Sequence, residues 1–310
     1  MRNCNKSILP ISFLLFAIIL FNYHLNAQKT GNLPEDFPEI QITAFDSPEP
    51  GYTFITPCGV FGHFPDAKPY LAIIDNYGTP IFYQKLTQPA FDFKLQANGM
   101  LSYNDGSGSQ SINIMDSSYN VVKKAAVLGY GTDFHEFRIL DNGNYLLLGM
   151  DDRLVDMDTV VAGGQPGVTV RGAYIQETTP EGTVLWEWTS WDHFKITDAM
   201  YFVDLTDPYM IDYVHANALD QDTDSTILIS SRNMYEVTKI NKNTGEIIWR
   251  MGGENKQITS NGYPVVFFAQ HHIRKIDNGN FIVFDNGWER EPQRSCVVEF
   301  QLDEINKVAT

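Results

Sequence analysis

The chain of 310 residues has few cysteines, and their spacing fits no metal site. They are Cys4, Cys58 and Cys296, whereas zinc-binding cysteines come in closely spaced pairs, so zinc fingers and zinc ribbons are excluded. Cys58 and Cys296 lie near opposite ends of the region that follows Cys4. Two alternatives stay open for them: a disulfide that joins the two ends of a domain, or two buried free thiols.

Positive charge is scarce as well. The chain has 22 Lys and Arg residues against 38 Asp and Glu residues, which gives a net charge of −16. Such a surface repels nucleic acid and anionic lipid, so we expect neither as a partner. An anionic substrate would need a local group of Arg and His side chains to bind it.

Long apolar runs are missing after residue 27. Before it, Arg2 and Lys6 precede an apolar run over residues 8–21, and residues 25–27 resemble a cleavage site. The run is short for a membrane-spanning helix. We therefore predict a signal peptide over residues 1–27 rather than a membrane anchor, and a periplasmic or secreted protein.

The rest of the chain lacks helical periodicity and contains short β runs separated by two kinds of turn. One kind, near residues 78, 118, 182 and 245, precedes an apolar pair. The other, near residues 98, 142, 224 and 278, leads into what we interpret as the inner strand of a sheet. The two kinds alternate strictly, as a repeat of about 40–50 residues, which is the period of a four-stranded propeller blade.

We predict an all-β protein with a leader over residues 28–51 and a β-propeller over residues 52–310. The repeat gives five recognisable blade cores, over residues 52–90, 91–128, 133–192, 213–252 and 268–305. We interpret residues 151–172 as a loop and residues 193–212 as a lid or rim excursion. Because a propeller closes its ring, we expect the last blade to be incomplete in this chain, and the natural protein to be longer or this chain to be a fragment.

The most informative stretch is residues 265–290, which we predict to be a strand, a tight turn at residues 277–279 and a second strand. Two adjacent histidines, His271 and His272, stand at the head of this hairpin. Neighbouring side chains of a strand point to opposite faces. One of the two imidazoles can therefore face a site.

Earlier blades carry histidine at comparable places. His135 lies seven residues before Asn142, as His271 lies seven before Asn278, and His215 precedes the turn near residue 224. A single histidine is more often structural, but repetition at one blade position favours a site. By contrast, His63 and His193 lie in turn-like sequence, and we expect surface roles for them.

Arg232 follows the strand after the turn near residue 224 and supplies a guanidinium group. Three imidazoles could hold Zn²⁺, but a cation would be repelled by this arginine. Arginine with several histidine donors suits a tetrahedral oxyanion better. We therefore expect no metal in the site.

Several segments together resemble the bacterial arylsulfotransferase (aryl-sulfate sulfotransferase) family: residues 213–218, 229–232, 245–253, 270–271, 278–280 and 284–287. The similarity extends from about residue 52 to the end of the chain. The resemblance implies a six-bladed, secreted or periplasmic propeller. It also implies transfer of a sulfuryl group from a phenolic sulfate ester to a phenolic acceptor, without the nucleotide sulfate donor and without a cofactor.

The family's Gln-His motif falls on Gln270-His271, which implies that His271 is the nucleophile and becomes transiently sulfated. The resemblance places Asn217 with three catalytic groups, His215, Arg232 and His135, as residues that bind the sulfate oxygens. His272 stands where the family commonly has an acidic or small residue, so the sequence leaves open which of the two imidazoles acts, and we place His272 with the substrate-binding residues. An imidazole nucleophile splits the transfer into two displacements and predicts ping-pong kinetics.

Two alternatives to this enzyme remain. One is a non-catalytic secreted propeller that binds a ligand or protein on its rim, because a fold does not dictate a function. The other is a quinone-dependent dehydrogenase, suggested by Gly-x-x-x-Trp at residues 182–186 and 245–249. We interpret those tryptophans as blade packing. The sequence has all four side chains that the mechanism needs: His135, His215, Arg232 and His271. Their presence favours the enzyme, acting as a monomer on small-molecule aryl sulfates and phenols.

Overall fold

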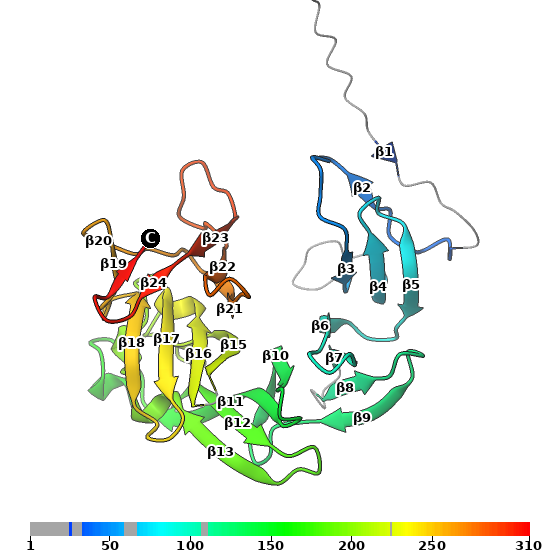
Figure 1. The fold of residues 1–310 in the computed structure, drawn as a ribbon. Helices are drawn as coiled ribbons and strands as arrows, with labels where there is room; N and C mark the ends of the chain where they lie inside the picture. The colour runs from blue at the N-terminus through cyan, green and yellow to red at the C-terminus, as the bar shows by residue number, and fades with distance from the viewer. Residues whose placement is uncertain (1–24, 27–32, 59–66, 107–110, 224) are drawn as a thin grey trace, which may run out of the picture.

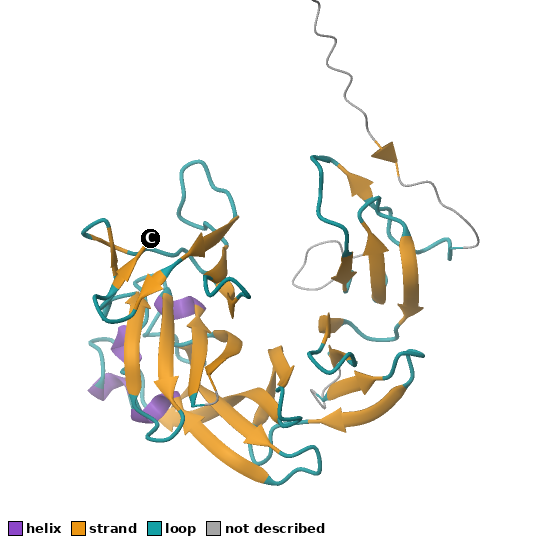
Figure 2. Ribbon diagram, viewed as in Figure 1, coloured by secondary structure: helices purple, strands orange, loops and turns teal. Residues whose placement is uncertain are grey.

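A computed structural model describes residues 25–26, 33–58, 67–106, 111–223 and 225–310. The described chain is all-β, as predicted, and its strands form several antiparallel sheets (Figure 2). Within these residues, helix is limited to four 3₁₀ turns of three residues each: η1 (Met157–Thr159), η2 (Ser190–Asp192), η3 (Ile196–Asp198) and η4 (Arg232–Met234).

Five sheets follow one another along the chain, and each coincides with one predicted blade core. The first sheet contains β3 (Tyr52–Ile55), β4 (Tyr70–Asp75) and β5 (Pro80–Lys85). The second contains β6 (Ala90–Leu95), β7 (Leu101–Asp105), β8 (Ile112–Met115) and β9 (Val121–Ala125). The third contains β10 (Gly131–Ile139), β11 (Tyr145–Val155), β12 (Val168–Thr178), β13 (Val184–Thr189) and β14 (Met210–Asp212).

The fourth sheet contains β15 (Ala216–Thr223), β16 (Thr226–Ser231), β17 (Glu236–Asn241) and β18 (Ile247–Gly252). The fifth contains β21 (His271–Lys275), β22 (Phe281–Asp285) and β23 (Cys296–Phe300). Two small sheets pair β1 (Leu25–Asn26) with β2 (Gln41–Ile42), and β19 (Thr259–Ser260) and β20 (Tyr263–Pro264) with β24 (Leu302–Asp303) and β25 (Val308–Ala309).

The five sheets lie along an arc, with the first and the fifth at its two ends (Figure 1). In the described residues no strand of the first sheet pairs with a strand of the fifth. Apolar side chains fill the space between neighbouring sheets. Leu146 and Leu148 of β11, for example, share one buried cluster with Ile227 and Ile229 of β16. Burial of such side chains is the main force that holds the sheets together.

The strands on the inside of the arc are the first strands of the sheets, because β10 contacts β6 and β15, and β15 contacts β21. The interpretation that the inner strands follow the second kind of turn is therefore wrong. Those strands, such as β11 and β16, are apolar and buried over most of their length. Both edges of each strand pair within its own sheet, and neighbouring sheets cover its faces.

The predicted turn positions are confirmed by the backbone. Glycine adopts a positive φ, which other residues rarely do, at Gly78, Gly99, Gly143, Gly182, Gly245 and Gly279. The degenerate turn near residue 118 has Tyr119 at this place, with φ 64°. The turn near residue 224 includes a position outside the described residues.

Two local predictions are wrong. Residues 151–172 are not one loop, because β11 and β12 extend into both ends of this range and leave residues 156–167 as the connection. Val168 and Val170 are buried there, so β12 continues as a packed strand. Residues 265–270 do not belong to a strand, because β21 begins at His271. Ala269 has φ 58°, which is incompatible with an extended strand.

The segment of residues 193–212, predicted to be a lid or rim excursion, contacts the third sheet and the loop that follows β16. Its last residues form β14, which pairs with β12 in parallel. In its middle, the Met200 amide donates a hydrogen bond to the Asn233 carbonyl (2.8 Å), next to Arg232. This segment therefore lies beside the residues that the sequence analysis places in the site.

The predicted signal peptide lies outside the described residues, apart from the two residues of β1. Within the part of the chain that the structure describes, no helix has the length and hydrophobicity needed to cross a membrane. Cys58 and Cys296 are free thiols, as in the second alternative, but both are half-buried and not buried.

Candidate active site

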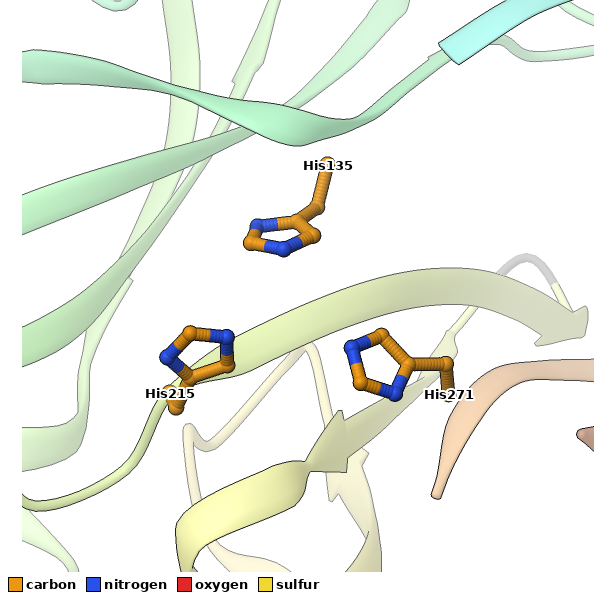
Figure 3. Close-up of side chains that lie close together, drawn as sticks. All are labelled: His135, His215 and His271. Carbon is orange, nitrogen blue, oxygen red and sulfur yellow. The ribbon is translucent and has the colours of Figure 1, made fainter. Parts of the chain in front are cut away.

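Three of the predicted residues meet on the inside of the arc. His135 lies on β10, His215 directly precedes β15, and His271 begins β21; their rings point toward one another (Figure 3). The ring centroid of His135 lies 5.2 Å from that of His215 and 5.9 Å from that of His271, and the third separation is 6.3 Å. One nitrogen of each ring lies within 4.8 Å of the other two.

Irregular backbone turns these histidines inward. Each of the inner strands β10, β15 and β21 has a register shift at or next to its histidine. His215 and His272 have positive φ values of 46° and 60°. A bulge of this kind bends a strand and redirects a side chain, and it is common beside active sites. Regular strands would not bring three imidazoles to one point.

Two of the imidazoles are held by carboxylates. Nδ1 of His135 lies 2.7 Å from Oδ1 of Asp133, and Nδ1 of His215 lies 2.7 Å from Oδ2 of Asp212. A carboxylate accepts a hydrogen bond, so the proton of each ring resides on Nδ1. The Nε2 atoms of both rings are then free to face the shared space.

The third imidazole is held by neutral groups. Nδ1 of His271 lies 3.0 Å from the carbonyl oxygen of Ala269 and 3.1 Å from Oδ1 of Asn286. Both oxygens accept, so this ring also carries its proton on Nδ1. Its Nε2 atom therefore has a free lone pair.

The partners separate the pKa values of these rings. Burial disfavours protonation of His135, but the hydrogen bond and charge of Asp133 outweigh it and raise the pKa above 6.5. Burial and the positive charge of His135 lower the pKa of His271 to about 4. At neutral pH His271 is therefore uncharged, while His135 takes up a proton more readily.

Arg232 begins the short turn η4 next to His215. Its backbone amide donates to the His215 carbonyl (3.0 Å), and its Nη1 donates to Oδ1 of Asn233 (2.6 Å). The guanidinium carbon lies 4.5 Å from the ring centroid of Trp288 and 5.6 Å from that of Phe202. These cation–π contacts hold the arginine against an aromatic wall beside the histidines.

Asn217 lies behind the loop of His271. It is 4% exposed, and its Nδ2 donates to the carbonyl of Gln270 (3.0 Å). Gln270 is fully buried and donates to the carbonyls of Ser231 (3.1 Å) and Glu236 (2.9 Å). The Gln-His pair thus consists of an anchored glutamine followed by a histidine that faces the site.

His272 is not a member of the cluster of three imidazoles. Desolvation and the positive charge of Arg274 lower its pKa to about 4. Arg274 belongs to a buried charge cluster centred on Glu136, whose side chain is 0% exposed. Glu136 pairs with Arg274 (2.5 Å) and Lys94 and accepts from the Leu219 amide (3.2 Å). This cluster links the inner strands β6, β10, β15 and β21.

A small pocket of ≈ 60 Å³ adjoins His135 and His215. Its lining includes Asp133, His135, Asp212, His215 and Arg171. That volume is smaller than a typical small-molecule site of about 300–1,000 Å³, so the pocket is a recess beside the histidines and not a full substrate cavity. The two carboxylates that hold the imidazoles therefore also border the space next to them.

Sequence reasoning missed several residues that this geometry brings forward: Asp133, Asp212, Asn286, Phe202, Trp288 and Glu136. A usable signal existed for the first two, because an aspartate stands two residues before His135 and three before His215. The aromatic residues and Asn286 gave no such signal. They come from loops whose approach to the site depends on the tertiary fold.

Comparison with solved structures finds distant similarities. A protein of unknown function from Bacteroides caccae is 15% identical, with a TM-score of 0.48, and the match covers 82% of this chain and 70% of that one. Hydrazine synthase from Kuenenia stuttgartiensis is 12% identical (TM-score 0.43; 77% and 70% covered). A streptogramin B lyase is 10% identical (TM-score 0.39), and the match covers 76% of this chain and 65% of that one. Similarities this distant carry no argument about function.

Comparison of the sequence with curated proteins gives no match. The sequence model of the arylsulfotransferase (ASST) family, by contrast, matches residues 49–310. That range includes all five sheets and every residue of the site described above. The chain belongs to the arylsulfotransferase (ASST) family.

Proposed function

We propose that this chain moves a sulfuryl group from a phenolic sulfate ester to a phenolic acceptor through a sulfohistidine at His271. Family membership supports aryl sulfotransfer in general. The observation that carries the mechanism is the arrangement of the three imidazoles, each held at Nδ1 with Nε2 free. Two have carboxylate partners, and His271 has a carbonyl and an amide oxygen instead.

In the first displacement, the Nε2 lone pair of His271 attacks the sulfur atom. The S–N bond forms, and the bond between sulfur and the aryl oxygen breaks. Its electron pair leaves with the phenolate, which takes a proton from a protonated imidazole or from water. In the second displacement, the acceptor oxygen attacks sulfur, the S–N bond breaks, and the acceptor's proton passes to an imidazole.

His271 suits the role of nucleophile better than its two neighbours. Its pKa of about 4 leaves the ring neutral at physiological pH, so the lone pair is available. The Ala269 carbonyl holds the proton on Nδ1 and keeps Nε2 directed into the site. His135, with its raised pKa, suits the role of a cationic donor.

Charge on the sulfuryl oxygens is stabilised by the remaining groups. His135, His215 and Arg232 each offer donors that favour an oxyanion in the transition state. Phosphoryl transfer relies on the same kind of fixed cationic donors. Phe202 and Trp288 flank Arg232 and provide apolar surface for an aryl ring. On this proposal Asn217 acts through the Gln270 carbonyl, as a positioning residue.

The finer features of the fold belong to the same proposal. We infer a six-bladed propeller, of which the five sheets are the described blades, directed to the periplasm or secreted by residues 1–27 and active as a monomer. The donor is a small aryl sulfate, the acceptor a phenol, and neither a nucleotide donor nor a cofactor takes part.

The test is release of nitrophenol from 4-nitrophenyl sulfate with phenol as the acceptor. We expect release that requires phenol, is lost in His271→Asn and persists in His272→Asn, the matched neighbour. The reverse pattern would move the nucleophile to His272. No release by folded wild-type protein with several aryl sulfates would favour the alternative of a secreted binding module.

A further inference from the structure

We propose that His135, His215 and His271 together bind a divalent transition-metal ion, for which Zn²⁺ is the best-suited probe, and that this ion excludes aryl sulfate from the site. The metal site rests on the geometry of three imidazoles, whereas its competition with aryl sulfate rests on the proposed function. It also changes the expectation from the sequence that no metal binds here. The ion is a competitor and takes no part in sulfuryl transfer.

The distances are close to those of a three-histidine metal site. Zn²⁺ binds imidazole nitrogen at about 2.0–2.1 Å in tetrahedral geometry, so ligand nitrogens lie roughly 3.3 Å apart. Here the nitrogens all lie within 4.8 Å of one another. Contraction of up to about 1.5 Å, by rotation of half-buried side chains, would complete the ligand set. A fourth position stays open for water.

The hydrogen bonds of the Nδ1 atoms also match those that metal-binding histidines make. Such histidines donate their second nitrogen to a carboxylate or backbone carbonyl, which fixes the tautomer and raises the basicity of the ligand. Asp133 and Asp212 are carboxylate partners, each at 2.7 Å. The Ala269 carbonyl is the partner of His271 at 3.0 Å. In the neutral form of each ring the lone pair is therefore on Nε2.

The charge around the cluster does not exclude a cation. In the sequence, only the positive charge of Arg232 speaks against a bound cation. In the structure, Asp133 and Asp212 place two carboxylates in direct contact with the rings. The guanidinium of Arg232 packs on Trp288 and donates to Asn233. A second arginine, Arg171, also borders the pocket, but it is paired with Asp152.

The ligand type selects the metal. Imidazole suits Zn²⁺, Cu²⁺ and Ni²⁺, whereas Mg²⁺ and Ca²⁺ require oxygen ligands. The cluster has three imidazoles and no carboxylate in its ligand set. A metal on Nε2 of His271 would occupy the lone pair on which sulfuryl transfer depends. Bound metal and bound donor are therefore mutually exclusive.

The test is calorimetric titration of Zn²⁺ into chelator-treated full-length protein, with Mg²⁺ as a second probe. We expect one Zn²⁺ per chain and no Mg²⁺ binding. The single variants His135→Ala, His215→Ala and His271→Ala should each weaken the affinity at least about tenfold, and Asp133→Asn about 10- to 100-fold. His193→Ala is the matched control, because His193 stacks on Trp188 outside the cluster.

Circular dichroism establishes that each variant is folded, and X-ray absorption of the Zn²⁺ complex should give three imidazole ligands. Absence of binding to folded wild-type protein would overturn the proposal. So would Zn²⁺ binding that persists unchanged in all three histidine variants. Because these readouts need no substrate, they stand or fall independently of whether the protein transfers sulfuryl groups.

Discussion

The imidazole rings of His135 and His271 lie 5.9 Å apart on the inner strands of two sheets, and their Nδ1 atoms face different partners. His135 faces a carboxylate of Asp133, and His271 faces the carbonyl of Ala269. The first partner favours a proton on the ring, and the second leaves the ring neutral. The proposed mechanism needs this division into a cationic donor and a neutral nucleophile.

The pH dependence of transfer follows from this division. Because the pKa of His271 is lowered to about 4, its lone pair stays available as the pH falls. With chelator present, kcat/KM for 4-nitrophenyl sulfate should stay constant as the pH falls to about 5. Below pH 4 it should decrease about tenfold per pH unit. The raised pKa of His135 places the alkaline limb above 6.5. An acidic limb at the ordinary histidine pKa of 6.5 would contradict the assignment.

Asp133 and Asp212 should matter without touching the substrate. Asp133→Asn and Asp212→Asn keep the size of the side chain but remove the negative charge that favours a protonated imidazole. We expect kcat to decrease roughly 10²-fold in each, and the alkaline limb of the Asp133→Asn profile to move to lower pH.

Asp152→Asn is the matched control, because Asp152 pairs with Arg171 on the surface. Because Arg171 borders the pocket, Asp303→Asn is a second control, at an exposed aspartate that accepts from Asn306 outside the site. The kinetics of Asp303→Asn should equal those of the wild type. If Asp133→Asn lowers only the melting temperature and leaves the pH profile in place, the aspartate has a structural role alone.

Arg232 should contribute to the transition state. Arg232→Ala removes a cationic donor. Loss of one such donor raises the free energy of the transition state by roughly 3–4 kcal/mol, which appears as a lower kcat/KM. Arg232→Lys should restore little, because an ammonium group reproduces neither the planar fork nor the stacking on Trp288. Steady-state kinetics with two different aryl sulfates measures both effects.

Arg153→Ala is the comparison for this arginine. Arg153 also lies over a tryptophan, with its guanidinium carbon 4.9 Å from the ring centroid of Trp191, but outside the cluster of histidines. It should leave kcat/KM unchanged. Equal losses in the two variants would mean that arginine–aromatic packing, and not charge at the site, explains the effect.

Glu136 should be essential for stability. Its carboxylate is buried among Arg274 and Lys94, so Glu136→Gln leaves Arg274 without its carboxylate partner, while Lys94 keeps Asp92. We expect the free energy of unfolding, measured with urea, to decrease by about 3–5 kcal/mol. Glu181→Gln, whose partner Lys123 is also exposed, should change it by less than about 1 kcal/mol.

The same carboxylate links stability to pH. Burial opposes its ionisation, but Arg274 and Lys94 outweigh burial and lower the pKa of Glu136 to about 2, below its ordinary 4.5. The stabilisation is therefore present above pH 4.5 and is lost as the pH falls toward 2. In Glu136→Gln this acid-dependent part of the unfolding free energy should be missing.

Local sequence signals predicted the sheets well. Turn glycines such as Gly143 and Gly279 require a backbone conformation that the residue type itself favours, so their positions located the blade cores. The spacing of the repeat alone was then enough to place His135, His215 and His271 at comparable positions in their blades.

What the sequence could not predict depends on irregular backbone and on contacts between blades. The strand β21 begins at His271, beside its bulge, so residues 265–270 look like a strand in sequence but are not one. The roles of Asp133 and Asp212 depend on ring orientation, which strand alternation does not give. Trp288, which follows β22, reaches Arg232 of the fourth sheet, and no spacing rule connects them.

Detection of a sulfated His271 tests the central claim most directly. Chelator-treated protein is mixed with 4-nitrophenyl sulfate without an acceptor, and the digested peptides are analysed by mass spectrometry. We predict a mass increase of one SO₃ group on the peptide that contains His271, localised to that residue, removed by added phenol and absent from His271→Asn. Rapid transfer to phenol without any sulfated histidine, or with the group on His272, would contradict the account.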